Sequence, residues 1–177
     1  MEITLREIDS QTVHCVNQCD ATFTIRSKLI LHAENGIIRY TAVDVEPYQK
    51  KYPIEEVDYS TYIGNPDKTI FFAYIDDHLA GQVRVLKWWN AYAYIDDIAV
   101  DVEFRRHGVG RALIERVIEW AKERKFPGIM LETQNNNVAA CRLYESCGFT
   151  LGGFDRYLYK ALDPKTDEIA LFWYMSF

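Results

Sequence analysis

The sequence has few cysteines and prolines and no long apolar run, and these absences exclude several classes of protein. Four cysteines and five prolines occur among 177 residues. The cysteines lack the close Cys-x-x-Cys spacing of a zinc site, and a chain of this length needs no disulfide to fold. No segment reaches the roughly 18 apolar residues of a membrane span, and the first ten residues do not resemble a signal peptide. We therefore expect reduced thiols, no bound metal, no membrane contact and a cytoplasmic location.

An excess of basic charge is also missing. The 26 Asp and Glu side chains outnumber the 20 Lys and Arg, so the formal net charge is −6. Sequence-independent binding of nucleic acid depends on basic side chains, so we expect no nucleic-acid partner. Residues 1–100 carry 15 acidic and 9 basic side chains, whereas residues 101–177 carry 11 of each. The acidic first part either serves solubility or attracts a cationic ligand.

The pattern of the remaining residues predicts one α+β domain over residues 1–177. Asn35-Gly36 predicts a hairpin within 29–43, and the Pro-containing segment 46–66 is expected to be irregular or partly helical. Apolar residues at four-residue spacing predict a helix over 108–124. A second helix is expected to begin after Asn137 and end at Gly148. Further strands are predicted at 2–8, 69–75, 79–89, 91–100, 128–133, 149–160 and 168–177.

The first predicted helix begins at two glycines, directly after an apolar strand. Gly108 and Gly110 would let backbone N–H groups approach an anion at the positive end of the helix dipole. Three arginines, Arg105, Arg106 and Arg111, surround the same turn. The turn lacks the Gly-Lys-Ser/Thr ending of a Walker loop and the third glycine of a dinucleotide fingerprint. A phosphate site is therefore predicted, and a glycine-eased helix start with solvated arginines is the alternative.

Two motifs here resemble those of the Gcn5-related N-acetyltransferases (GNAT). One is Arg-x-x-Gly-x-Gly at 105–110, and the other is Asn-x-x-Ala-x-x-Leu-Tyr-x-x-x-Gly-Phe at 137–149. The tract LETQNNNVAACRLYESCGFTLGGFD and the ending EIALFWYMSF resemble the streptothricin acetyltransferases within that family. One departure is Val102, where many relatives carry proline. The resemblance implies a mixed, mostly antiparallel twisted sheet flanked by helices, with a splayed central strand that binds acetyl-CoA.

The resemblance also implies roles for particular residues. Glu132 corresponds to the general base of some family members, and Tyr144 to the tyrosine beside the thioester sulfur, which would act as general acid. Asn137 corresponds to the asparagine that contacts pantetheine. The cofactor-binding positions that it implies are Ile98, Ala99, Val100, Arg105, Arg106, His107, Gly108, Val109, Gly110, Arg111, Asn137 and Tyr144.

The chemistry of amine acetylation independently requires a base and an acid. A primary amine with a pKa near 10 is only about one part in 10³ neutral at pH 7, so a proton must be removed before or during attack. Each candidate also has a structural explanation. Tyr144 could be a core aromatic of its helix, and Glu132 could be a solvent-facing strand residue. An acyl-cysteine at Cys141 or Cys147 is disfavoured, because Cys147 is expected on the apolar face of its helix, where a buried thiol is inert.

The acceptor is expected to contact the acidic first part of the chain. Strand alternation should send Asp96 and Asp97 to opposite faces, so only one of them would face the acceptor. Trp89 and Tyr94 could stack on a cation, and ordinary sheet packing is the alternative.

The favoured function is direct transfer of acetyl from acetyl-CoA, in a ternary complex, to a small cationic antibiotic. The acceptor would be an amine of the β-lysine moiety of streptothricin, and the result antibiotic resistance. The alternatives are an acetyltransferase for protein or peptide amines and a non-catalytic acyl-CoA-binding sensor. The protein would be a monomer or a homodimer.

Overall fold

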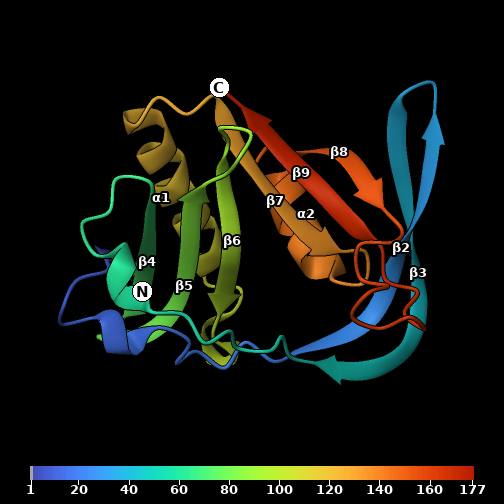
Figure 1. Cartoon of the computed structure of the whole chain (residues 1–177). Helices are drawn as coiled ribbons and strands as arrows, with labels where there is room; N and C mark the ends of the chain where they lie inside the picture. The colour runs from blue at the N-terminus through green and yellow to red at the C-terminus, as the bar shows by residue number, and fades with distance from the viewer. Residues whose placement is uncertain (1) are drawn as a thin grey trace. The chain divides into compact units, whose positions relative to one another are not determined.

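The computed structural model describes residues 2–177, and the chain divides into two compact units (Figure 1). The first unit consists of residues up to 23, residues 51–129 and residues 176–177. The second unit consists of residues 24–50 and 130–175. Strands and α-helices occur in both units, which agrees with the predicted α+β class.

Four antiparallel strands form the sheet of the first unit. They are adjacent in the order β1 (Ile3–Glu7), β4 (Lys68–Ile75), β5 (His78–Lys87) and β6 (Ala93–Val100). Asp76 and Asp77 connect β4 to β5 with φ angles of 48° and 64°. This left-handed conformation is the one that tight hairpin turns require, and Asp tolerates it better than most residues. The predicted strands of this region are confirmed, with ends that differ by a few residues.

Helix α1 (Val109–Glu123) packs against the strands of this unit, as Figure 1 shows. Its apolar stripe is fully buried, and each large aliphatic side chain in it contributes roughly 1.5–3 kcal/mol to folding. The buried residues of the helix are Val109, Leu113, Ile114, Val117, Trp120 and Ala121. The predicted helix over 108–124 is therefore confirmed to within one residue at each end.

A second apolar cluster lies in the same unit. Ile8, Val16, Tyr62, Ile70 and Phe72 form it, together with residues of the short helices η1 (Val13–Cys15) and η2 (Tyr59–Tyr62). Successive side chains of β4 point to opposite faces of the sheet, and side chains on both faces are buried. This explains why the sequence of β4 is a continuous apolar run and does not alternate between apolar and polar residues.

The sheet of the second unit contains β7 (Gly128–Gln134), β9 (Ala170–Ser176) and β8 (Thr150–Asp155), adjacent in that order. The first two residues of β7 belong to the first unit. Helix α2 (Val138–Ser146) buries Cys141 and Tyr144. The predicted strand 149–160 is too long. The Asp155 carboxylate accepts from the backbone N–H groups of Tyr157, at 2.6 Å, and Leu158, at 3.1 Å. This local turn ends the strand.

A long hairpin completes the second unit. Strands β2 (Phe23–Glu34) and β3 (Ile37–Lys50) are joined by Asn35 and Gly36, whose φ angles are 51° and 75°. The predicted hairpin is confirmed, but the expectation that residues from Glu46 onward are irregular is wrong for 46–50. Proline is tolerated within β3 at position 47 because each strand of a two-stranded sheet has a free edge, where no N–H donor is needed.

Candidate functional site

The turn between β6 and α1 is built by short-range contacts. Asp101 caps the short helix η3 (Val102–Phe104), since its Oδ1 accepts from the Glu103 N–H at 3.0 Å. Arg106 and Gly108 then take positive φ angles of 64° and 87°. These two left-handed residues turn the chain sharply enough for α1 to begin directly after the strand.

The start of α1 has the properties of an anion site. Gly108 is its N-cap and has no side chain to cap the helix, and no acidic residue lies in the first turn. The positive end of the helix dipole is therefore not neutralised by a local carboxylate. Arg106, His107 and Arg111 are exposed around this turn, and Arg105 is half-buried, with its Nε donating to the Val100 carbonyl at 3.3 Å. The predicted phosphate-binding residues therefore lie around one turn, and their chemistry fits a phosphate.

The strand before this turn is held close to its neighbours. Ile98, Ala99 and Val100 are half-buried at the end of β6. Gly81 lies opposite Val100, and a Cβ at position 81 would lie 2.8 Å from the Ala99 carbonyl oxygen and 2.9 Å from Val109 Cγ1. Only glycine allows β5 to approach both β6 and the first turn of α1.

The two aspartates of β6 lie on one face of the strand, so the predicted alternation is wrong here. Arg84 pairs with Asp97, but the next residue along β5, Val85, pairs with Ile95, so Asp96 is the extra residue of a β-bulge. The bulge interrupts the two-residue period of the strand. Gln82 and Arg84 lie on one face of β5 as alternate residues, and each hydrogen-bonds one of the aspartates.

These hydrogen bonds place the carboxylates of Asp96 and Asp97 in different electrostatic environments. Arg84, which is only 7% exposed, donates from Nε to Asp96 at 2.5 Å and also pairs with Glu55 at 3.6 Å. Asp97 accepts from Gln82 Nε2 at 2.8 Å. Burial raises the pKa of Asp97 above its ordinary value, and the Gln82 hydrogen bond and the Arg84 charge oppose that rise. The charge of Asp96 is thus matched by Arg84, and Asp97 is the less compensated carboxylate.

Trp89 and Tyr94, the two aromatic residues predicted to stack on a cation, have different surroundings. The Trp89 side chain is 86% exposed. Tyr94 stacks on Trp88, with ring centroids 4.4 Å apart and an interplanar angle of 25°. Trp89 is therefore open to a ligand, whereas one face of Tyr94 is covered by ordinary packing.

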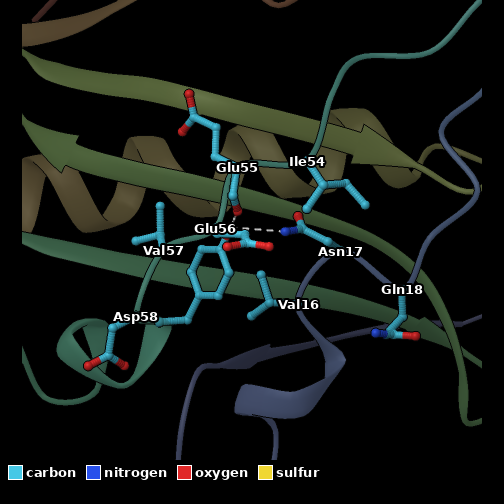
Figure 2. Close-up of a pocket in the computed structure, with 9 residues that line it drawn as sticks. Val16, Asn17, Gln18, Ile54, Glu55, Glu56, Val57 and Asp58 are labelled. Carbon is cyan, nitrogen blue, oxygen red and sulfur yellow. Dashed lines mark hydrogen bonds between the residues drawn. The ribbon is translucent and has the colours of Figure 1, made fainter.

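A cavity of about 560 Å³ lies in the first unit, between residues 16–18 and 54–59 (Figure 2). Glu55, Glu56 and Asp58 line it, and no Lys or Arg does. The Tyr59 hydroxyl joins its walls, because it accepts from Asn17 Nδ2 at 2.9 Å and donates to the Glu55 carbonyl at 3.0 Å. Arg84 pairs with Glu55 and donates to the Tyr59 hydroxyl at 3.2 Å, so the negative charge available to a bound cation comes from Glu56 and Asp58. This cavity was not predicted from the sequence, although three carboxylates within four consecutive residues, Glu55, Glu56 and Asp58, pointed to an acidic surface there.

In the second unit, Glu132 is a partly buried carboxylate of β7. Its Oε1 is fully buried and has no hydrogen-bond partner among residues 2–177. Burial, and secondly the charge of Glu168, raise the pKa of Glu132 to about 7, and Lys50 opposes this rise. A carboxylate with this pKa exchanges its proton near neutral pH, as a general base must.

Tyr144 and Asn137 both lie on α2 or at its start. The Tyr144 ring is buried, and its centroid lies 6.0 Å from that of Phe149 and 6.3 Å from that of Trp173. Tyr144 is therefore a core aromatic of its helix, as the alternative to a catalytic role predicts. Asn137 caps the helix, since its Oδ1 accepts from the Ala140 N–H at 3.3 Å.

Cys147, which was expected to be buried, is only partly buried, and Cys141 is the buried cysteine of this helix. Burial raises the pKa of Cys141 to about 12. A thiol with this pKa is a poor nucleophile at neutral pH.

Two kinds of feature are absent from the described residues, 2–177. No group of three or more His, Cys, Asp or Glu side chains in that range could hold a metal ion. No α-helix in the same range has the length and apolar character needed to cross a membrane.

Comparison with known families agrees with this geometry. The profile of the acetyltransferase (GNAT) family matches residues 37–149, which is more than half of the chain. This chain belongs to the GNAT family. The matched region of this GNAT protein includes the turn at Arg105–Arg111, Glu132 and the Asn137–Phe149 motif. The predicted family and the predicted GNAT fold are confirmed.

Similarity extends over the full length of this GNAT chain. It is 40% identical to streptothricin acetyltransferase A of Bacillus subtilis (strain 168) over 162 residues, which are 91% of this chain and 92% of that protein. A crystal structure from Bacillus anthracis, of a protein assigned as a streptothricin acetyltransferase in complex with acetyl coenzyme A, is 42% identical, with a TM-score of 0.92. That match covers 100% of this chain and 98% of the other. The crystal structure of nourseothricin acetyltransferase is 33% identical, with a TM-score of 0.82 and 99% coverage of both chains.

Proposed function

We propose that this protein transfers the acetyl group of acetyl-CoA to an amine of the β-lysine moiety of streptothricin and thereby confers resistance to that antibiotic. The observation that carries the proposal is the full-length similarity to streptothricin acetyltransferases, at 40% identity over 91% of the chain. The acidic character of the first 100 residues supports a cationic acceptor. The cavity lined by Glu55, Glu56 and Asp58 supports it further.

Binding of acetyl-CoA is assigned to the turn before α1. In this proposal the backbone N–H groups of Gly108–Gly110 and the Arg105, Arg106, His107 and Arg111 side chains hold the pyrophosphate. The backbone of Ile98–Val100 lies along pantetheine, and Asn137 contacts it too. When bound, acetyl-CoA supplies the thioester that is cleaved. The helix start, which has no side-chain cap and no acidic residue in its first turn, favours this assignment.

Glu132 is proposed as the general base. At pH 7 the neutral fraction of an amine with a pKa near 10 is about 10⁻³, a handicap of roughly 4 kcal/mol. A carboxylate whose pKa is about 7 is half ionised at that pH and can take the ammonium proton as the nitrogen attacks. Such a base contributes about 10² to 10⁴ in rate. The buried and unpaired Oε1 supports this role.

Tyr144 is proposed as the general acid that donates its phenolic proton to the departing thiolate. The new bond joins the amine nitrogen to the acetyl carbon, and the carbon–sulfur bond breaks. Glu132 takes one proton from the ammonium group, and the resulting neutral amine attacks. The proton of Tyr144 passes to the departing sulfur, and the second proton of the nitrogen then restores the Tyr144 hydroxyl, so charge and atoms balance. Packing against Phe149 and Trp173 holds the Tyr144 ring in one orientation.

Acceptor contacts are proposed for Asp96, Asp97, Trp89 and Tyr94. Among these, the open indole of Trp89 and the less compensated carboxylate of Asp97 have the better-suited surroundings. We further propose that the protein acts in the cytoplasm, as a monomer or homodimer with one domain over residues 1–177, and does not bind nucleic acid.

The test is acceptor-dependent release of thiol from acetyl-CoA. Streptothricin, lysine-terminated peptides and simple diamines serve as the acceptor panel. Release with streptothricin at lower concentration than with any other acceptor is the expected result. Release with peptides alone would replace the antibiotic by a protein substrate. An absence of acceptor-dependent release, with acetyl-CoA still bound, would favour a non-catalytic sensor.

A further inference from the structure

A polar cluster in the second unit surrounds Glu168, a residue to which sequence analysis gave no role. Glu168 Oε1 accepts hydrogen bonds from Lys50 Nζ, at the end of β3, and from Asn136 Nδ2 at 2.9 Å. Asn136 lies in the loop between β7 and α2, next to the cap residue Asn137. Glu132 lies on β7, the strand that leads to Asn136, and the charges of Glu168 and Lys50 act on its carboxyl group.

The hydrogen bonds fix the orientation of the Asn136 amide. A carboxylate only accepts hydrogen bonds, so the NH₂ group must face Glu168. The same NH₂ group donates to the Tyr48 hydroxyl at 3.1 Å. The carbonyl oxygen, Oδ1, therefore points away from both partners.

Asn136 Oδ1 is an unsatisfied acceptor in a buried position. Asn136 is only 7% exposed, and no group in residues 2–177 donates a hydrogen bond to its Oδ1. Buried carbonyl groups are almost always hydrogen-bonded in folded proteins, and leaving one unpaired costs free energy. By contrast, both the nitrogen and the oxygen of the neighbouring Asn135 side chain have a partner, since the amide donates to the Leu29 carbonyl and accepts from the Ile169 N–H.

Glu132 Oε1 is likewise buried and has no hydrogen-bond partner. Within residues 2–177, two buried acceptor atoms are therefore left without a donor. Lys50, a cation that could have served, is paired with Glu168. A primary ammonium group offers three N–H donors on one nitrogen, which is the kind of donor that these acceptors lack.

We propose that Asn136 is an acceptor-binding residue whose Oδ1 accepts a hydrogen bond from the ammonium group that is acetylated, beside Glu132. Glu168 acts as a positioning residue, because it holds the Asn136 amide in the orientation that presents Oδ1 to the ammonium. This inference rests on the proposed function, in which a primary amine is the acceptor and Glu132 the base.

The test uses steady-state kinetics with streptothricin and acetyl-CoA as the two varied substrates. Asn136→Ala should raise the KM for streptothricin about 10- to 100-fold, as expected for loss of a hydrogen bond to a charged group. The KM for acetyl-CoA should stay within about twofold, which also shows that the variant is folded. Tyr48→Phe is the matched control, because it removes a contact of the same amide on the side away from Oδ1. Its KM for streptothricin should stay within about threefold.

A restoring variant guards against a loss of fold. Glu168→Gln keeps an oxygen that can accept from Asn136 Nδ2, whereas Glu168→Ala removes it, so the KM of Glu168→Gln for streptothricin should lie well below that of Glu168→Ala. An unchanged streptothricin KM in Asn136→Ala would overturn the inference and leave the proposed function intact. An equal rise in Glu168→Gln and Glu168→Ala would overturn the positioning role of Glu168. Wild-type protein that acetylates no amine would overturn the proposed function and this inference together.

Discussion

Replacing Glu132 by glutamine is the perturbation that most directly examines the proposed chemistry. Burial and the Glu168 charge raise the pKa of Glu132 from 4.5 to about 7, so the free enzyme carries a base that ionises near neutral pH. The acidic limb of kcat/KM reports the pKa of such a base. At pH 5 only about 1% of a group with a pKa near 7 is ionised. For the wild type, kcat/KM for streptothricin should therefore fall about 50- to 100-fold between pH 8 and pH 5.

Glu132→Gln removes the base and keeps the size of the side chain. At pH 8 it should lower kcat/KM by about 10² to 10⁴. The remaining activity depends on amine that is already neutral in solution. Its kcat/KM should therefore keep rising about tenfold per pH unit through pH 8, without the plateau of the wild type.

The assay is thiol release from acetyl-CoA between pH 5 and pH 9.5, with acetyl-CoA binding measured separately to control for folding. An acidic limb of the same shape and midpoint in both proteins would refute the assignment, because another group would then be taking the proton.

Three further predictions concern the proposed acid, the stability of the Glu132 site and the fit of Gly81. Tyr144→Phe should lower kcat at least tenfold with little change in the KM for acetyl-CoA, and unchanged turnover would remove Tyr144 from its role. Folded Glu132 retains its proton up to a higher pH than unfolded Glu132, so this group costs stability as pH rises from 4.5 to about 7. In urea unfolding at pH 8, Glu132→Gln should therefore be more stable than the wild type by up to about 3 kcal/mol, and a variant that is less stable there would contradict the raised pKa. Gly81→Ala would place a Cβ 2.8 Å from the Ala99 carbonyl oxygen, so it should cost about 1–3 kcal/mol and weaken acetyl-CoA binding. Gly153→Ala, with no atom within 4 Å, is its control, and equal effects of the two would refute the close approach at Gly81.

The features that sequence analysis predicted well are encoded by residues close together in the chain. Helix α1 follows from one apolar stripe between Val109 and Ala121, and the β2–β3 turn follows from Asn35-Gly36. The turn before α1, which is proposed to bind phosphate, is likewise contained in seven consecutive residues, Arg105–Arg111. In each case the local pattern carries the structural reason, so the prediction needs no tertiary information.

The missed features depend on contacts between distant residues or on pairing register. Lys50 and Glu168 are 118 positions apart, and Asn136 and Glu168 are 32 apart, so no local pattern brings them together. The Asp96 bulge is set by how β5 pairs with β6, which strand alternation alone does not reveal. Strand β3 continues through Pro47 because its neighbour lies on one side only, a fact that belongs to the sheet and not to the segment.

The central claim is tested most directly by identifying the product formed from streptothricin and acetyl-CoA. The purified protein is incubated with both compounds, and the product is analysed by mass spectrometry with fragmentation. The proposed function predicts a single added acetyl group on an amine of the β-lysine moiety, together with one equivalent of free coenzyme A. Streptothricin that is recovered unmodified, or that carries its acetyl group elsewhere, would contradict it.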